Sequence, residues 1–234
     1  MVVENSTFRV GIALLSGGGI AVLGSGGSKL YLEGRNLFLN VGAGFGAALA
    51  VTGDSNEIIV SNSAGAGVII ADSYGISAAG AVYLSEKGRL TVSKTGKLTV
   101  FNTGASVGGA IVATGASVDV LGLVSIRNTG SFASSAATRG GGISIEAGGE
   151  VNVHPGGRVL MEYCLSTDSG GAVHVSGAGS ALAAYPEAEL LLRGNTAEAG
   201  SGGAIIATAA SSVFLYGEIV SLTHNTAGVH GGAL

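Results

Sequence analysis

The tetrapeptide Gly108-Gly109-Ala110-Ile111 and its repetitions along the chain decide the fold. The tetrad returns as Gly170-Gly171-Ala172-Val173, Gly202-Gly203-Ala204-Ile205 and Gly231-Gly232-Ala233-Leu234. With Gly109 as the reference, the equivalent positions are Gly19, Ala47, Gly80, Gly109, Gly142, Gly171, Gly203 and Gly232. These positions span 213 residues in seven intervals, a mean of about 30, and self-similarity at such a period is typical of a repeat architecture.

A short apolar run follows each of these positions, and two further apolar segments come before the next one. Leu90-Thr91-Val92 followed by Leu98-Thr99-Val100 is one such pair of segments. The alternation of period two and the β-branched residues indicate strands, and the Gly, Ser and Asn residues between them indicate turns. The sequence therefore predicts three short strands per repeat. The repeat that begins at Ala47 is shorter, so we expect it to lack one strand.

Three strands in about 30 residues predict a solenoid, because no single repeat can bury its apolar face without its neighbours. We predict an all-β fold, a right-handed single-stranded parallel β-helix of about eight coils of about 30 residues. The hand follows from the handedness of parallel crossovers. Residues 1–234 form one segment of it, and we expect a longer solenoid that continues into flanking domains, because neither end carries a polar cap. A β-propeller is excluded, since its blades need roughly 40–45 residues.

An asparagine two or three positions after an apolar residue marks a corner upstream of most tetrads. The corner residues are Asn5, Asn40, Asn62, Asn102, Asn128, Asn195 and Asn225, with Cys164 replacing Asn in the remaining repeat. Asparagine tolerates a left-handed backbone, and its side chain can hydrogen-bond neighbouring amides. We therefore expect these residues to form a ladder that joins neighbouring coils, whereas Asn56 is expected to face solvent.

The composition restricts the classes of protein. Glycine makes up 43 of 234 residues, about 18% against a usual share of roughly 7%, yet not at every third position as in collagen. Hydrophobic residues at 47% and charged residues at 11% argue against disorder. The net charge of −4 and the lack of a basic stripe predict no nucleic-acid partner. The long uncharged runs are interrupted by Gly, Ser and Thr, so we expect no membrane span in this segment.

The tetrads and corners together resemble the GGA[ILV] and FxxN halves of the repeat of chlamydial polymorphic membrane proteins. The second half reads apolar-x-x-Asn here, from Leu37 to Asn40, Ile59 to Asn62, Leu192 to Asn195 and Leu222 to Asn225. Asn102 and Asn128 have their apolar residue two positions before them instead. The resemblance implies an autotransporter-like passenger, secreted or at the cell surface (the outer membrane in a bacterium). It also implies an adhesive or antigenic role, with a host-cell receptor or glycan as a possible partner.

Residues that usually carry catalysis are few and scattered. The closest acidic pair is Glu187 and Glu189, which we expect to be solvated. The four histidines, His154, His174, His224 and His230, lack metal-ligand spacing. Cys164 is expected to be a buried, inert thiol. The sequence therefore predicts a non-enzymatic scaffold with no catalytic residue, metal or cofactor. A β-helical carbohydrate-active enzyme, of the polysaccharide lyase or glycoside hydrolase type, is the alternative, since stacking could bring distant carboxylates together. An apolar membrane protein comes third.

Three stretches between an asparagine and the next tetrad are longer than the seven residues found in most repeats. They are Ser6–Gly18, Ser63–Ala79 and Thr129–Gly141, and we expect them to be insertions at one corner of every second coil. Insertions two coils apart lie about 9–10 Å from each other, so they can form one patch. Each combines an aromatic residue with a charged one, and such residues are common binding anchors on loops. The candidate binding residues are Phe8, Arg9, Asp72, Tyr74, Phe132 and Arg139.

Overall fold

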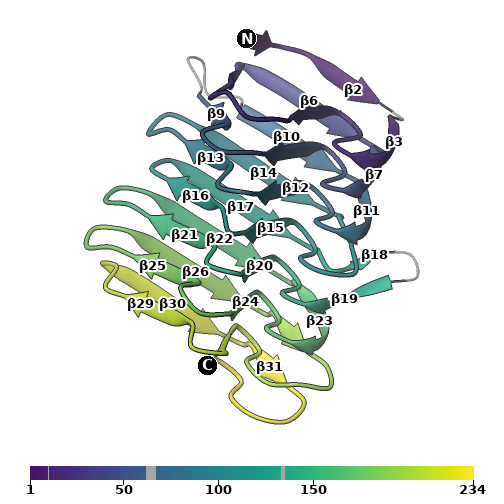
Figure 1. The fold of residues 1–234 in the computed structure, drawn as a ribbon. Helices are drawn as coiled ribbons and strands as arrows, with labels where there is room; N and C mark the ends of the chain where they lie inside the picture. Colours follow the sequence, from purple (N-terminus) through teal and green to yellow (C-terminus); the bar gives the residue numbers. More distant parts are fainter. Residues whose placement is uncertain (10, 62–66, 133–134) are drawn as a thin grey trace.

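The coils of the chain stack in sequence order into a parallel β-solenoid, with the two termini at opposite ends of the stack (Figure 1). The structure is a computed structural model, and it describes residues 1–9, 11–61, 67–132 and 135–234. The strand register connects Val2 to Phe214 through seven coil-to-coil steps, so a coil averages about 30 residues. The predicted all-β parallel β-helix is confirmed, and its right-handed winding stays a prediction.

Two sheets of eight strands run the length of the solenoid, and we call them sheet A and sheet B. Sheet A contains β1 (Val2–Glu4), β5 (Lys29–Glu33), β9 (Glu57–Val60), β13 (Arg89–Val92), β16 (Ser117–Val120), β21 (Glu150–Val153), β25 (Ala181–Ala184) and β29 (Ser212–Leu215). Sheet B contains β2 (Thr7–Arg9), β6 (Arg35–Leu39), β10 (Gly67–Ala71), β14 (Lys97–Phe101), β17 (Leu123–Arg127), β22 (Arg158–Glu162), β26 (Glu189–Arg193) and β30 (Ile219–Thr223).

The strands between sheet B and the next strand of sheet A belong to three further sheets, with sheet C in the first three coils and sheet E in the last four. Sheet C contains β3 (Ile12–Ser16), β7 (Gly42–Phe45) and β11 (Tyr74–Ala78), and sheet E contains β18 (Ser131–Phe132), β19 (Ser135–Arg139), β23 (Leu165–Ser169), β27 (Thr196–Ala197) and β31 (Thr226–Ala227). Sheet D follows them with β4 (Ile20–Val22), β8 (Leu49–Thr52), β12 (Val82–Ser85), β15 (Ile111–Thr114), β20 (Ile143–Glu146), β24 (Val173–Ser176) and β28 (Ile205–Thr208). All described pairings between coils are parallel.

Alternation along the strands of sheets A and B points one set of side chains into the core. In β14, Leu98 and Val100 are completely buried, whereas Lys97 and Thr99 on the other face are only partly covered. Branched aliphatic side chains fit this pleated surface, and each one stacks on its counterpart in the next coil. Buried aliphatic residues of sheets A, B and D therefore form one continuous apolar core along the solenoid.

The structure explains why glycine occupies both of the first two positions of the tetrad. Gly170 has a φ of +70°, which L side chains rarely adopt. A Cβ on Gly171 would overlap the backbone of Gly203 in the next coil and of Thr196 on sheet E. The hydrogen-bond pattern places Gly18 and Gly141, rather than Gly19 and Gly142, at the position of Gly171.

Most coils contain one more strand than the sequence predicts, because sheets C and E lie between sheets B and D. The coil of β13, β14 and β15 has only isolated bridges there, at Gly104 and Val107. The prediction of a missing strand after Ala47 is wrong, since β9 and β10 are both present there. Two of the three predicted insertions are also wrong, because these stretches consist of regular strands of the coils. Ser6–Gly18 contains β2 and β3, and Ser63–Ala79 contains β10 and β11. The error arose because Asn5 lies between sheets A and B, before the corner that carries Asn102. Thr129–Gly141 does contain an extra strand, β18, which pairs antiparallel with β19, the sheet E strand of that coil.

Every regular element that the structure describes is a β-strand. The described ranges therefore include no helix of the length and apolar character that crossing a bilayer requires.

Candidate functional site

Five of the corner asparagines lie in two adjacent columns at the end of sheet B, where a column is the set of equivalent residues in successive coils: Asn40, Asn102, Asn128, Asn195 and Asn225. In the first column the backbone is left-handed, with φ between +49° and +64°, and its members are Asn40, Asp72, Asn102, Asn128, Tyr163, Gly194 and His224. Backbone bonds between coils, such as Asn102 N–H to the Arg127 carbonyl and Asn128 N–H to the Glu162 carbonyl, fix this alignment. Asn40 and Asn128 are exposed, so these side chains line the outer rim of the corner. Asn62 lies outside the described residues.

The second column points inward and holds the hydrogen-bonded ladder. It contains Val41, Ser73, Thr103, Thr129, Cys164, Asn195 and Asn225. The Asn195 side chain is fully buried, and its Oδ1 accepts a hydrogen bond from the Cys164 N–H at 2.9 Å. Its Nδ2 donates to Asn225 Oδ1 at 2.9 Å, so this bond joins neighbouring coils. Cys164 therefore replaces asparagine in the column of Asn195 and Asn225, whereas Asn102 and Asn128 belong to the outer rim.

Cys164 is buried at this corner, and its thiol has one hydroxyl partner. Burial raises the pKa of the thiol to about 12, against the weaker opposite effect of the hydrogen bond from Thr129 Oγ1. A thiol of this pKa is protonated at neutral pH and is no nucleophile. The expectation of a buried thiol is confirmed, and its lack of reactivity stays a prediction.

Two further asparagines have structural roles that the sequence analysis missed. Asn56 is buried rather than solvent-facing, so that expectation is wrong. Its Oδ1 accepts from the Ser28 N–H at 2.9 Å, and its Nδ2 donates to the carbonyls of Gly24 and Thr52. Asn36 is likewise buried and bonds Ser6 N–H, Val3 O and Glu33 O. Both close corners by satisfying backbone groups of two coils at once.

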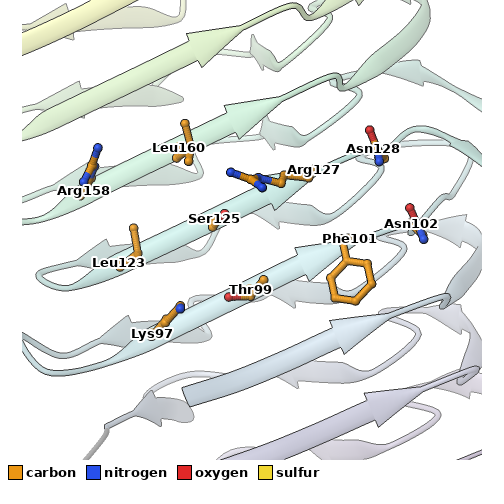
Figure 2. A pocket seen from close by; sticks show the side chains of 10 residues that line it. All are labelled: Lys97, Thr99, Phe101, Asn102, Leu123, Ser125, Arg127, Asn128, Arg158 and Leu160. Carbon is orange, nitrogen blue, oxygen red and sulfur yellow. The ribbon is translucent and has the colours of Figure 1, made fainter. Parts of the chain in front are cut away.

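The outer face of sheet B is hollowed across β14, β17 and β22. The hollow measures about 580 Å³, within the range typical of ligand pockets. Figure 2 shows its lining side chains on three neighbouring strands and at their corner: Lys97, Thr99, Phe101, Asn102, Leu123, Ser125, Arg127, Asn128, Arg158 and Leu160. We call this set the sheet B groove. The short side chains of Thr99 and Ser125 form its middle, between cationic side chains and the corner amides.

The sheet B groove is lined by cations and neutral polar groups, and no carboxylate is among its lining residues. Arg127 pairs with Glu162 at 2.8 Å, and Arg158 pairs with Glu189 at 2.9 Å, each toward the next coil. Within the described ranges, Lys97 has no ion-pair partner. The arrangement can therefore offer positive charge, hydroxyls, amides and one aromatic ring to a ligand from fixed strands.

The predicted binding residues lie along the same side of the solenoid but do not form one loop patch. Phe8 is half-buried and stacks on Phe38, with ring centroids 4.6 Å apart, so it packs against the core. Arg9 ends β2 and is exposed. Asp72 lies on the outer rim and accepts a hydrogen bond from Asn102 Nδ2 at 3.2 Å.

The other three predicted residues lie in sheets C and E. Tyr74 begins β11, and Arg139 ends β19 with an exposed side chain. Phe132 belongs to β18, and its side chain lies outside the described part of the structure. The three aromatic–charge sets come from coils that are two steps apart along the stack.

A second polar cluster occupies the outer face of sheet A. Asp119 Oδ1 lies 2.8 Å from His154 Nε2, and Asp119 Oδ2 lies 3.5 Å from Arg89 Nε. The His154 ring stacks on Tyr185 with centroids 5.6 Å apart. This carboxylate–imidazole pair is the closest approach to acid–base machinery in the described ranges. They contain no group of three or more His, Cys, Asp or Glu side chains that could hold a metal ion.

The sequence analysis missed both the sheet B groove and the Asp119–His154 pair, because each joins residues from different coils. Aligning the repeats by strand register would have placed Asp119 opposite Asn152, two residues before His154. It would also have placed Lys97, Leu123 and Arg158 in one column.

Comparison of the chain with family models, with curated proteins and with solved structures found no match.

Proposed function

We propose that this chain is a non-enzymatic recognition segment of a secreted or cell-surface protein, which binds its partner through the outer face of sheet B. This role agrees with the adhesin or passenger function implied by the resemblance to the chlamydial repeat. The sheet B groove carries the proposal, because it concentrates cations, hydroxyls and amides in a hollow of ligand size on a rigid sheet. Binding sites on regular strands are held more firmly than sites on loops.

The side chains that point inward beneath the sheet B groove are apolar and buried, which favours recognition through the outer face. Every inward-facing position of β14, β17 and β22 holds an aliphatic or sulfur-containing side chain that is at least 98% buried. Chemistry available to a partner therefore lies outside the solenoid, where side chains repeat at the spacing between strands, about 4.8 Å. Such a surface suits an extended partner that contacts several coils.

The experiment fills the groove and measures binding to host cells and to a glycan array. Ser125→Trp places a large ring in the middle of the groove, where Ser125 is nearly covered by its neighbours. Ser221→Trp is the matched control, because Ser221 lies in the same column of sheet B three coils away. We expect Ser125→Trp to lose binding while circular dichroism stays unchanged, and Ser221→Trp to bind normally. Equal binding by the wild type and both variants would refute the proposal.

A second candidate function, a β-helical carbohydrate-active enzyme, draws its support from the Asp119–His154 pair. A carboxylate bonded to imidazole can orient the ring for proton transfer, and 34% of the His154 side chain is exposed to solvent. Polysaccharide cleavage by the wild type that is lost in Asp119→Asn would favour this candidate. Cleavage that survives the substitution, or none in the wild type, would count against it.

A further inference from the structure

We propose that the sheet B groove binds an acidic polysaccharide, a linear chain of uronic acid units lying parallel to the solenoid axis. This inference rests on the proposed function and names the ligand class of the same site. The sheet B groove is lined by positive charges, whereas the net charge of the whole chain is negative.

The positive charge extends beyond the groove to the neighbouring corner between sheets A and B. A second hollow there shares Lys97, Leu123 and Arg158 with the sheet B groove and adds Lys94. Thr95 and backbone at Gly96, Gly122 and Gly156 complete its lining. The two hollows together thus present Lys94, Lys97, Arg127 and Arg158 with no lining carboxylate, although the net charge of the chain is −4.

The ion pairing and the exposure of these four cations leave them able to bind an anion from outside the protein. In the part of the chain that the structure describes, neither Lys94 nor Lys97 has a carboxylate within ion-pair distance. The side chains of Arg127 and Arg158 remain about half exposed although each is paired. Because an arginine side chain carries five N–H donors, Arg127 and Arg158 can each donate hydrogen bonds to a ligand carboxylate while the ion pair with their own glutamate stays intact.

The spacing of the cations suits a chain that follows the axis. Lys97, Leu123 and Arg158 occupy one column in three successive coils. Lys97 and Arg158 are therefore about 9–10 Å apart at the backbone. A pyranose unit is close in length to one strand spacing, and alternate carboxylates of an extended uronate chain project to the same side. One carboxylate can thus reach Lys97 and the next on that side can reach Arg158, with an intervening sugar over Leu123.

The neutral lining favours a sugar chain over a nucleic acid. Hydroxyls of Thr99 and Ser125 and amides of Asn102 and Asn128 match the hydroxyl groups of a sugar. Phe101 supplies the one aromatic ring in the lining, whereas nucleic-acid grooves combine an extended basic track with several stacking rings. Four cations on a chain of net negative charge suit a polyanion of low charge density.

The experiment titrates the full chain with oligogalacturonate by calorimetry, and with uncharged oligogalactose and single-stranded DNA as comparison ligands. Lys97→Glu reverses one charge at a residue that lines both hollows. Lys87→Glu makes the same change at an exposed site between sheets D and A, where Lys87 lies 3.4 Å from Asp54. We expect Lys97→Glu to weaken oligogalacturonate binding at least about tenfold and Lys87→Glu to leave it nearly unchanged. Binding to the wild type should weaken as salt is added.

Absence of oligogalacturonate binding, equal binding of oligogalactose, or equal loss in both variants would overturn the inference. Tighter binding of DNA would also overturn it, by assigning the groove to nucleic acid. If Lys97→Glu fails to fold, Lys97→Gln and the exposed Lys94→Glu replace it, with a several-fold loss expected from each. Loss of cell binding in Ser125→Trp without any oligogalacturonate binding would leave the proposed recognition role standing and remove only this ligand class.

Discussion

Replacing Asn195 by valine tests the inward ladder that ties the last coils together. The side chain is fully buried and makes three hydrogen bonds: Oδ1 accepts from Cys164 N–H, and Nδ2 donates to the Met161 carbonyl at 3.3 Å and to Asn225 Oδ1. Valine fits the column, since Val41 occupies the equivalent position and is buried. The substitution therefore removes hydrogen bonds with little steric change, and it leaves the Cys164 N–H buried without its partner.

The expected loss follows from that orphaned group. A buried donor left without an acceptor costs about 1–3 kcal/mol. Asn225 Oδ1 keeps the Asn195 backbone N–H at 3.0 Å, so it adds little to the loss. For a chain of this size, that range corresponds to a fall in Tm of about 2–12 °C.

The assay is denaturant unfolding followed by circular dichroism, with Asn152→Val as the matched control. Asn152 lies on the outer face of β21 and makes only long hydrogen bonds of 3.4 Å, to Glu150 and Tyr185. We expect the control to change the free energy of unfolding by less than about 0.5 kcal/mol. Equal effects of the two substitutions would refute the ladder as a source of stability.

Three further predictions concern single positions in the core and at the corners. Burial lowers the pKa of His174 below the ordinary 6.5, against a smaller opposite effect of Glu146, and its Nδ1 is buried without a partner among the described residues. Because the folded state then binds fewer protons than the unfolded state, the contribution of His174 to the free energy of unfolding should be constant above about pH 6.5 and fall as the pH drops below it. His174→Val should flatten this fall, whereas the exposed His230→Gln should preserve it. Cys164 should resist a thiol reagent in native buffer and react fully in denaturant, and rapid native labelling would contradict its burial. Gly171→Ala should prevent folding or strongly lower the Tm, because its Cβ would overlap backbone atoms of Gly203 and Thr196. Gly42→Ala is the control and should be tolerated, since the nearest atom to its Cβ would be 3.4 Å away. Similar stability of both variants would contradict the close packing at Gly171.

Most of the fold could be predicted from the repeat period and from the alternation of apolar and polar residues in the sequence. Leu90, Val92, Leu98 and Val100 were readable as strand residues because β-branched and aliphatic residues alternate with polar ones. The register was harder, because runs such as Gly17-Gly18-Gly19 and Gly140-Gly141-Gly142 allow a shift of one residue without changing the local pattern. Short strands on sheets C and E escaped notice, since Gly- and Ala-rich segments such as Gly42–Phe45 have almost no alternation.

Asparagine was an ambiguous marker because it serves two physical roles at neighbouring positions. Asn102 and Asn128 supply a left-handed backbone, whereas Asn195 and Asn225 supply an inward amide. The sequence contained the distinguishing signal: the inward aliphatic residue stands two positions before Asn102 and three before Asn195. The sheet B groove had no local signal, since its lining residues come from three coils and converge only after the repeats are aligned.

The in-register stacking of coils underlies every proposal for the outer faces, and distances between spin labels test it most directly. Tyr31, Thr91 and Phe214 lie in one outward column of sheet A, with Phe214 six coils from Tyr31 and four from Thr91. At the strand spacing, labels on the pair Tyr31/Phe214 should be about 29 Å apart and labels on Thr91/Phe214 about 19 Å apart. Cys164 should not compete for the label, because it is buried. Two sharp distances that differ by about two strand spacings are the predicted result, whereas broad distributions, or distances unrelated to the number of coils, would contradict the solenoid.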